Sequence, residues 1–209
     1  MENQQREIVQ GTLGMFQRYG IRSVTMDDVA GEMGVSKKTI YKFFDNKADL
    51  VHQSVISLFT CVKSRLEGVH ANAVNAIDEL IAIDDIVGSI MESHNPSLRY
   101  QLKKYYPQTY NQFYCGRKDM LTRMISENME LGIKDGWYRE DACVEIISQL
   151  YCAKLEAMPE EEEQLFSKYP IRYLMRQSME YHIRGIASCK GLEYLETVLE
   201  KEKNTQNDD

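Results

Sequence analysis

Four side chains able to bind phosphate groups and bases lie together between residues 37 and 42. Lys37, Lys38 and Lys42 supply cations, and Tyr41 supplies a ring and a hydroxyl. Cations and hydroxyls on one short helix suit contacts with the phosphate oxygens and base edges of DNA. A solvated basic face on a small helical bundle is the alternative, and the spacing alone favours neither.

Two short helices joined by a turn would position these side chains. Thr25 followed by Asp28 predicts a helix start with an acidic first turn. Gly34 permits a tight turn soon afterwards, and Ser36 predicts the N-cap of a second helix over residues 37–43. A helix pair of this kind is a helix-turn-helix, whose second helix enters the major groove end first.

Buried anchors and a third helix start complete this segment. Val35, Ile40 and Phe44 are expected to face inward, which leaves the polar side chains outside. Asn46 can cap the next helix, and Lys47 then lies beside unpaired amides as a second phosphate contact. The predicted DNA contacts are Thr25, Ser36, Lys37, Lys38, Thr39, Tyr41, Lys42 and Lys47.

The overall charge does not oppose this interpretation. The chain has 209 residues and a formal net charge of -7, but residues 1–50 carry as many basic as acidic side chains. An acidic protein binds nucleic acid where its positive charge is local. No apolar run approaches the roughly 20 residues of a membrane span, and the polar start has no signal-peptide core. We therefore expect a cytoplasmic protein without a membrane segment.

Apolar residues recur every three or four positions along almost the whole chain, and alternating β-branched runs are absent. The sequence therefore predicts an all-α fold with an N-terminal three-helix DNA-binding domain over 1–48. A helical effector-binding and dimerisation domain is expected over 49–203, with an exposed acidic stretch at 158–164 and a frayed tail at 204–209. Helix ends are predicted at Gly20, Gly34, Pro96, Pro107 and Gly136, and Gly191 is expected to kink or interrupt the last helix.

An aromatic segment over residues 98–120 suggests a pocket for an apolar or aromatic effector, with methionines as adaptable neighbours. Ordinary packing between helices accounts for the same residues. The predicted pocket residues are Met91, Tyr105, Tyr106, Tyr110, Phe113, Tyr114, Met120 and Met124.

Two apolar stripes near the end of the chain could form a four-helix dimer interface. Packing within one chain is the alternative, and His182 is expected to be a satisfied core or interface histidine rather than a proton switch. The predicted interface residues are Ile146, Leu150, Leu174, Ser178, His182 and Ile186.

Catalytic and metal-binding constellations are missing from the sequence. There is no P-loop, no GxGxxG after a strand and no GxSxG elbow, and the histidines are isolated. The one Glu67-x-x-His70 pair lacks the second copy that bundle metal sites use. No catalytic residue, metal or cofactor is predicted. The scattered cysteines are expected to be reduced and mostly buried, with a redox switch as the alternative.

Residues 24–51 resemble the DNA-binding segment of TetR-family transcriptional regulators. Matching positions include Ala30, residues 34–36, Ile40 with Tyr41, Phe44, Lys47 and Leu50. Residues 132–141 are similar to a turn in the second domain of that family. Lys38 and Phe43 depart from its usual residues, so the base sequence that it reads does not carry over.

The resemblance implies a homodimer that binds a palindromic operator, holds a small-molecule effector in its C-terminal domain, and contacts DNA through Lys37, Thr39, Tyr41 and Lys47. We therefore expect a repressor released by its effector. The alternatives are a helix-turn-helix regulator controlled by a protein partner and, from another class, a helical-bundle enzyme or metal protein.

Overall fold

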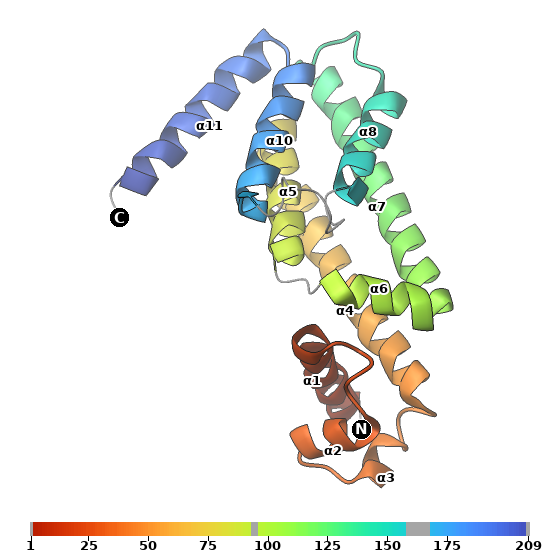
Figure 1. Cartoon of the computed structure of the whole chain (residues 1–209). Helices are drawn as coiled ribbons and strands as arrows, with labels where there is room; N and C mark the ends of the chain where they lie inside the picture. Colours follow the sequence, from red (N-terminus) through yellow and green to blue (C-terminus); the bar gives the residue numbers. More distant parts are fainter. Residues whose placement is uncertain (1, 93–95, 158–167, 208–209) are drawn as a thin grey trace. The chain divides into compact units, whose positions relative to one another are not determined.

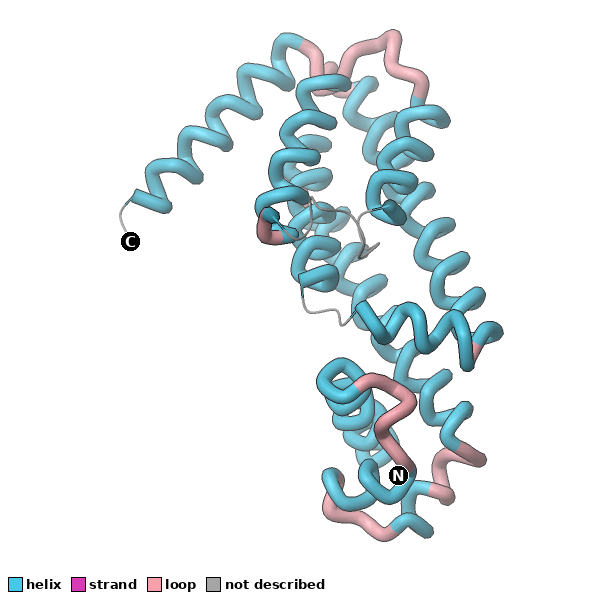
Figure 2. Tube along the Cα trace, in the orientation of Figure 1, coloured by secondary structure: helices cyan, strands magenta, loops and turns pink. Residues whose placement is uncertain are grey.

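The computed structural model describes residues 2–92, 96–157 and 168–207, and every regular element in these ranges is a helix (Figures 1 and 2). The expected all-α fold is confirmed. The acidic stretch at 158–164 and the last two residues lie outside the described ranges. In chain order the helices are α1 (Glu2–Tyr19), α2 (Met26–Glu32), α3 (Lys37–Ile40), α4 (Lys47–Asn72), α5 (Ala76–Glu92), α6 (Pro96–Tyr105), α7 (Pro107–Lys134), α8 (Val144–Ala157), α10 (Ile171–Ile186) and α11 (Cys189–Asn207).

Most predicted helix ends are confirmed. Gly20, Gly34 and Gly136 follow α1, α2 and α7 with positive φ angles of 78°, 63° and 73°, which side chains with a Cβ rarely adopt. Pro96 and Pro107 stand at the first positions of α6 and α7, where a missing amide hydrogen leaves no helical bond unmade.

The predicted interruption at Gly191 is wrong. The break falls between α10 and α11, at Ala187 and Ser188, and the Ser188 hydroxyl accepts a hydrogen bond from the Gly191 amide at 3.2 Å. Gly191 lies inside α11, where a Cβ would collide with the carbonyl oxygen of Trp137. Its lack of a side chain therefore serves close packing rather than a kink.

The described residues pack into two compact units. The first contains residues 2–64 and 96–118, and the second contains residues 65–92, 119–157 and 168–207. Helices α4 and α7 thus contribute their N-terminal parts to the first unit and their C-terminal parts to the second. The functional boundary at 48/49 stays a prediction. Helix α11 continues to Asn207, beyond the expected end of regular structure at 203.

The core of the first unit joins the DNA-binding segment to α6. Ile8, Phe16 and Ile40 are buried in one cluster, and Leu98 and Leu102 of α6 belong to the same cluster. Burial of apolar surface is the dominant favourable term in folding. The three N-terminal helices therefore share their core with a helix far along the chain.

The second unit is built around α5 and α10, which lie side by side (Figure 1). Buried apolar side chains of α10, including Met175, Met179 and Ile183, recur at helical spacing and give this helix one buried face. On α5 the carboxylate of Glu79 is buried, and it accepts hydrogen bonds from His70 Nδ1 at 2.6 Å and Asn128 Nδ2 at 2.8 Å. This polar network joins α4, α5 and α7 within the second unit.

Candidate nucleic-acid interface

Helix α2 begins with a capping box. The Thr25 hydroxyl accepts a hydrogen bond from the Asp28 amide at 3.1 Å, and the Asp28 carboxylate accepts one from the Thr25 amide at 2.8 Å. The carboxylate also accepts a hydrogen bond from the Thr25 hydroxyl at 2.8 Å, and the two bonds that Thr25 donates to it lower the pKa of Asp28 below its ordinary value. The predicted start is confirmed, and the Thr25 hydroxyl serves the cap in this structure.

Helix α3 starts as predicted but is shorter than the predicted range 37–43. The Ser36 hydroxyl accepts a hydrogen bond from the Thr39 amide at 3.1 Å, which fixes the first turn. After Ile40 the chain tightens, because the amides of Phe43 and Phe44 both donate to the Ile40 carbonyl, at 3.0 and 3.1 Å. The turn carries Phe44 into the core, where it is 1% exposed.

The buried and exposed side chains of α3 and of the turn that follows it are those the sequence predicts. Ile40 is fully buried, whereas Lys37, Lys38 and Lys42 are exposed and Tyr41 is 47% exposed. Thr39 and Val35 are half-buried. Because the buried side chains of Ile40 and Phe44 hold this segment against the core, the backbone that carries the cations is held in place.

The exposed lysines of this surface differ in their partners. Lys37 Nζ donates to Asp27 Oδ2 at 2.9 Å, and this bond raises the pKa of Lys37. Within the described ranges, no hydrogen bond or ion pair joins the amines of Lys38 and Lys42 to another residue. Lys38 and Lys42 can therefore bind a phosphate without breaking an ion pair to a described residue. Lys37 must first give up its bond to the Asp27 carboxylate.

Lys47 is held more tightly than predicted. Its Nζ donates to the Arg22 carbonyl at 3.3 Å, and burial lowers its pKa while the charge of Asp28 opposes that shift. The Arg22 amide in turn donates to Gln101 Oε1 at 2.8 Å, and its guanidinium donates to the Tyr105 hydroxyl at 3.1 Å. Lys47 thus lies at the end of a hydrogen-bonded chain that reaches α6.

Sequence reasoning missed Arg22 and Gln101. Arg22 lies in the turn between α1 and α2, and its guanidinium also stacks over the Tyr105 ring at 5.3 Å. No local pattern marks this contact, because its partners are about eighty residues apart in the chain. Only the packing of α6 against the N-terminal helices brings them together.

The predicted effector residues are divided between the two units. Tyr105, Tyr106, Tyr110, Phe113 and Tyr114 belong to the first unit, whereas Met91, Met120 and Met124 belong to the second. In the first unit the rings of Tyr110 and Tyr114 lie 4.2 Å apart and those of Phe113 and Tyr114 lie 5.1 Å apart, in the manner of ordinary aromatic packing. A pocket formed by all eight side chains stays a prediction.

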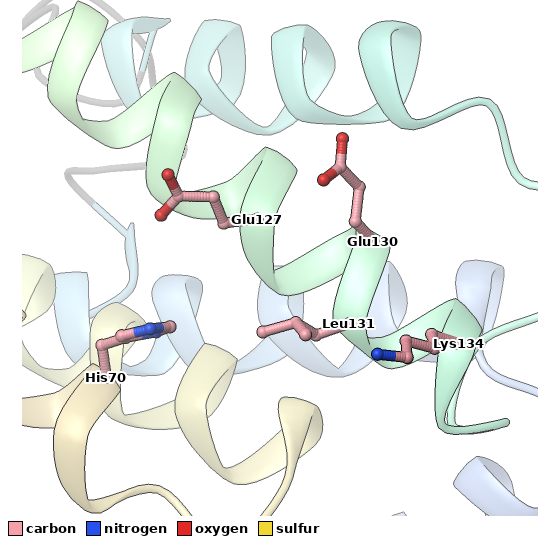
Figure 3. A pocket seen from close by; sticks show the side chains of 5 residues that line it. All are labelled: His70, Glu127, Glu130, Leu131 and Lys134. Carbon is pink, nitrogen blue, oxygen red and sulfur yellow. The ribbon is translucent and has the colours of Figure 1, made fainter.

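A pocket of about 350 Å³ lies elsewhere in the second unit, between the end of α4 and the last turns of α7 (Figure 3). Its lining residues are His70, Glu127, Glu130, Leu131 and Lys134, and none of them was predicted to bind an effector. The four residues of α7 recur at i, i+3, i+4 and i+7, a pattern that marks one face of a helix but no particular ligand.

The predicted dimer residues divide into exposed and buried groups. Ile146 and Leu150 on α8 are 58% and 62% exposed, as an interface with a second copy requires. Leu174 and Ile186 on α10 are buried against other residues of the same unit, at 9% and 4% exposed. Ser178 and His182 are half-buried. The exposed face of α10 carries Tyr173 and Tyr181 instead, at 51% and 83% exposed.

The expectation of mostly buried thiols is wrong. Cys61, Cys115, Cys143 and Cys189 are exposed, and Cys152 is buried. Among the residues that the structure describes, no three His, Cys, Asp or Glu side chains could together hold a metal ion. No helix in the same ranges is long and apolar enough to cross a membrane.

Comparison with known sequences identifies the N-terminal segment. Residues 8–53 match the sequence profile described as bacterial regulatory proteins, tetR family. An uncharacterized HTH-type transcriptional regulator of Mycobacterium tuberculosis is 43% identical over 54 residues. That alignment spans 26% of this chain and 22% of the relative. Most of the relative's length therefore lies outside the match.

Comparison with solved structures extends the likeness to the whole fold. A TetR transcriptional regulator from Chloroflexus aurantiacus superposes with a TM-score of 0.72 at 17% identity, over 89% of this chain and 97% of the other. A transcriptional regulator from Cytophaga hutchinsonii also gives a TM-score of 0.72, at 12% identity, over 88% and 98%. At these identities the likeness shows the fold alone.

Proposed function

We propose, from an N-terminal segment that belongs to the TetR family of bacterial regulatory proteins and a described chain with the TetR-type fold, that this protein is a homodimeric DNA-binding repressor. The observation that carries the proposal is the surface of α3. Lys38 projects there from a helix anchored by Ile40, and Tyr41 and Lys42 stand exposed in the turn that follows it. A short helix with this surface suits the major groove, with the amines on phosphates and Tyr41 at a phosphate or base edge.

The exposed faces of α8 and α10 support a dimer. Ile146, Leu150, Tyr173 and Tyr181 are large apolar or aromatic side chains that stay exposed in one chain. Two such helices from each of two copies would form a four-helix interface around a two-fold axis. A two-fold dimer places its recognition helices about 34–36 Å apart, one turn of DNA, so the operator should be an inverted repeat.

A small-molecule effector would release the operator by favouring another separation of the two recognition helices. Such a ligand shifts the equilibrium only by the difference between its affinities for the two states. We therefore expect operator DNA to bind best to one conformation of the dimer and the effector to bind best to the other.

Selection of bound fragments from random DNA tests the DNA-binding function. An inverted repeat should be enriched. Lys38→Ala and Lys42→Ala should each reduce the slope of log affinity against log salt by about one for every phosphate that the amine neutralises in the wild type. Lys134→Ala, which removes an exposed lysine of the second unit, is the matched control and should keep the wild-type slope. Unchanged slopes in both α3 variants would rule out the assigned phosphate contacts.

Sedimentation of Leu150→Arg and Tyr181→Arg tests the interface. Both should give monomers that lose operator binding while α3 remains intact, because an unpaired charge would be buried between the copies. Val74→Arg, at a side chain 87% exposed in the same unit, is the control and should stay dimeric. Dimers in both test variants would place the interface on other helices.

A further inference from the structure

A cluster of charged and polar side chains lies inside the second unit, between α5, α8 and α10. The Asp84 carboxylate accepts a hydrogen bond from the Tyr151 hydroxyl at 3.2 Å and lies 3.6 Å from Lys154 Nζ. Lys154 Nζ also lies 4.3 Å from the centre of the Tyr151 ring, and the His182 ring lies 5.1 Å from that ring. Asp84 and Tyr151 are 4% and 0% exposed, so the cluster is internal.

Among the residues that the structure describes, three polar atoms in and beside this cluster make no hydrogen bond. They are Ser148 Oγ, His182 Nε2 and Lys154 Nζ, and each is shielded from solvent. Lys154 Nζ keeps its ion pair with Asp84 at 3.6 Å but makes no hydrogen bond. Ser148 is itself 0% exposed, and it lies three residues before Tyr151 on the same side of α8. Buried polar groups are hydrogen-bonded in nearly all native proteins, so three such atoms without a bond on neighbouring helices indicate a partner outside the described residues.

The unpaired groups are mainly hydrogen-bond donors. An ammonium and a hydroxyl both donate, and a neutral imidazole nitrogen donates in one of its two tautomers. The acceptor present in the cluster, Asp84, already receives the Tyr151 hydroxyl and faces Lys154. The missing partner should therefore supply acceptor oxygens and should be able to face a lysine.

We propose that Ser148, Lys154 and His182 form the polar end of the effector site and bind the carboxylate of a small, otherwise apolar acid. This inference deepens the proposed function, because it assigns a chemical class to the effector on which that function depends. Lys154 is the counter-ion of the ligand, and Ser148 and His182 donate to its oxygens.

The apolar part of such a ligand would have to displace the flexible side chains packed beside the cluster. Met175 on α10 packs against Gly88 on α5, with 3.7 Å between its Cγ and the position of a Cβ at Gly88. Gly88 lies one helical turn from Asp84, and Met179 lies one turn from both Met175 and His182. Unbranched thioether side chains repack readily, so a ligand can displace them without moving a helix.

The ionisation of the cluster fits an incoming anion. Burial raises the pKa of Asp84 to about 6, Lys154 and Tyr151 oppose this shift, and the neighbouring Asp85 adds to it. Burial and the charge of Lys154 keep His182 neutral by lowering its pKa to about 4. A second carboxylate facing Lys154 would raise the pKa of Asp84 further, so Asp84 takes up a proton when the acid binds. The affinity for the carboxylate should therefore fall as the pH rises through neutrality.

Titration calorimetry on the DNA-free wild-type protein tests the site with straight-chain carboxylates from hexanoate to dodecanoate. At least one of these acids should bind with a stoichiometry of one acid molecule per protein chain. Proton uptake on binding should appear as a dependence of the measured binding heat on the ionisation enthalpy of the buffer. The matched methyl ester and primary amine should not bind. Lys154→Met should weaken the carboxylate at least about tenfold, and Ser148→Ala by a smaller factor.

Variant folding and site position need their own controls. Because Lys154→Met leaves Asp84 buried without a counter-ion, the double variant Asp84→Asn/Lys154→Met removes both charges and should fold and still fail to bind. Lys134→Met changes the pocket at His70 and should keep wild-type affinity.

Four outcomes would overturn the assignment: no carboxylate binds, the ester or amine binds instead, the double variant binds normally, or Lys134→Met abolishes binding. Any of these would leave DNA binding by the α3 surface standing. A carboxylate that binds at Lys154 but leaves operator affinity unchanged would instead confirm the site and refute effector-controlled repression.

Discussion

Replacing Asp84 and His182 one at a time should change the pH dependence of folding stability in opposite directions. Both side chains belong to the internal cluster of α5, α8 and α10. Burial raises the pKa of Asp84 from 3.8 to about 6 and lowers the pKa of His182 from 6.5 to about 4. The two groups therefore titrate in overlapping ranges with opposite signs.

The magnitudes follow from linkage between proton binding and folding. Between pH 3.8 and about 6 folded Asp84 holds its proton more tightly than the unfolded chain does. The free energy of unfolding thus falls by about 3 kcal/mol as the pH rises through this window, at about 1.4 kcal/mol per pKa unit. Between pH 6.5 and about 4 the unfolded chain binds the proton of His182 more tightly. Stability is therefore lost, again by about 3 kcal/mol, as the pH falls through that window.

Urea denaturation of three proteins at about pH 4.5 and about pH 6.5 measures both contributions. Asp84→Asn removes the term that falls with pH, so its stability should rise with pH more steeply than that of the wild type. His182→Gln removes the opposite term, so its stability should rise less steeply or fall. The variants are compared by the slope of stability against pH, because Asp84→Asn also removes the carboxylate that pairs with Lys154 and so changes the absolute stability.

Asp85→Asn is the matched control for this experiment. Asp85 neighbours Asp84 on α5 and its charge adds to the raised pKa of Asp84, but it is exposed, so its replacement should change the slope in the same direction as Asp84→Asn and by much less. Parallel pH profiles for the wild type, Asp84→Asn and His182→Gln would refute the burial argument for both groups.

Three further predictions concern other parts of the fold. Ser36→Ala removes the oxygen that caps α3 and should lower the free energy of unfolding by about 1 kcal/mol in urea titration, with weaker DNA binding; an unchanged midpoint would mean that the cap adds nothing. His70→Gln should reduce stability more at acid than at alkaline pH in thermal melts, because Glu79 raises the pKa of His70 and that stabilisation is present below pH 6.5 and lost as the pH rises through the raised value. Equal losses at both ends of the pH range would contradict this. Gly191→Ala should lower the melting temperature, since the new Cβ meets the Trp137 carbonyl, and a wild-type melting temperature would show that the backbone there yields.

Local patterns were sufficient for the helices and for the face of the DNA-binding segment. Thr25 and Ser36 cap α2 and α3 as their types and positions predict, and Ile40 and Phe44 are buried by their spacing. Caps and helical periodicity act over three or four residues, so the sequence carries them directly. Helix α3 is shorter than predicted, because the chain tightens after Ile40, where the Phe43 and Phe44 amides donate to one carbonyl.

Contacts between distant residues could not be predicted in the same way. The bond from the Arg22 amide to Gln101 spans 79 positions in the chain, and apolar periodicity alone did not tell that Leu174 packs within the chain while Leu150 stays exposed. An amphipathic stripe shows that a helix buries one face, but it does not show against what.

The sequence by itself determined the helices, their caps and the cations of the predicted DNA-binding surface, because these depend on side-chain type and short spacing. Only the tertiary structure decided that Lys37 pairs with Asp27 while Lys38 and Lys42 pair with no described residue, and that Asp84, Lys154 and His182 meet inside one unit. Charge pairing and burial depend on which helices pack together. That packing is a property of the whole chain rather than of any segment of it.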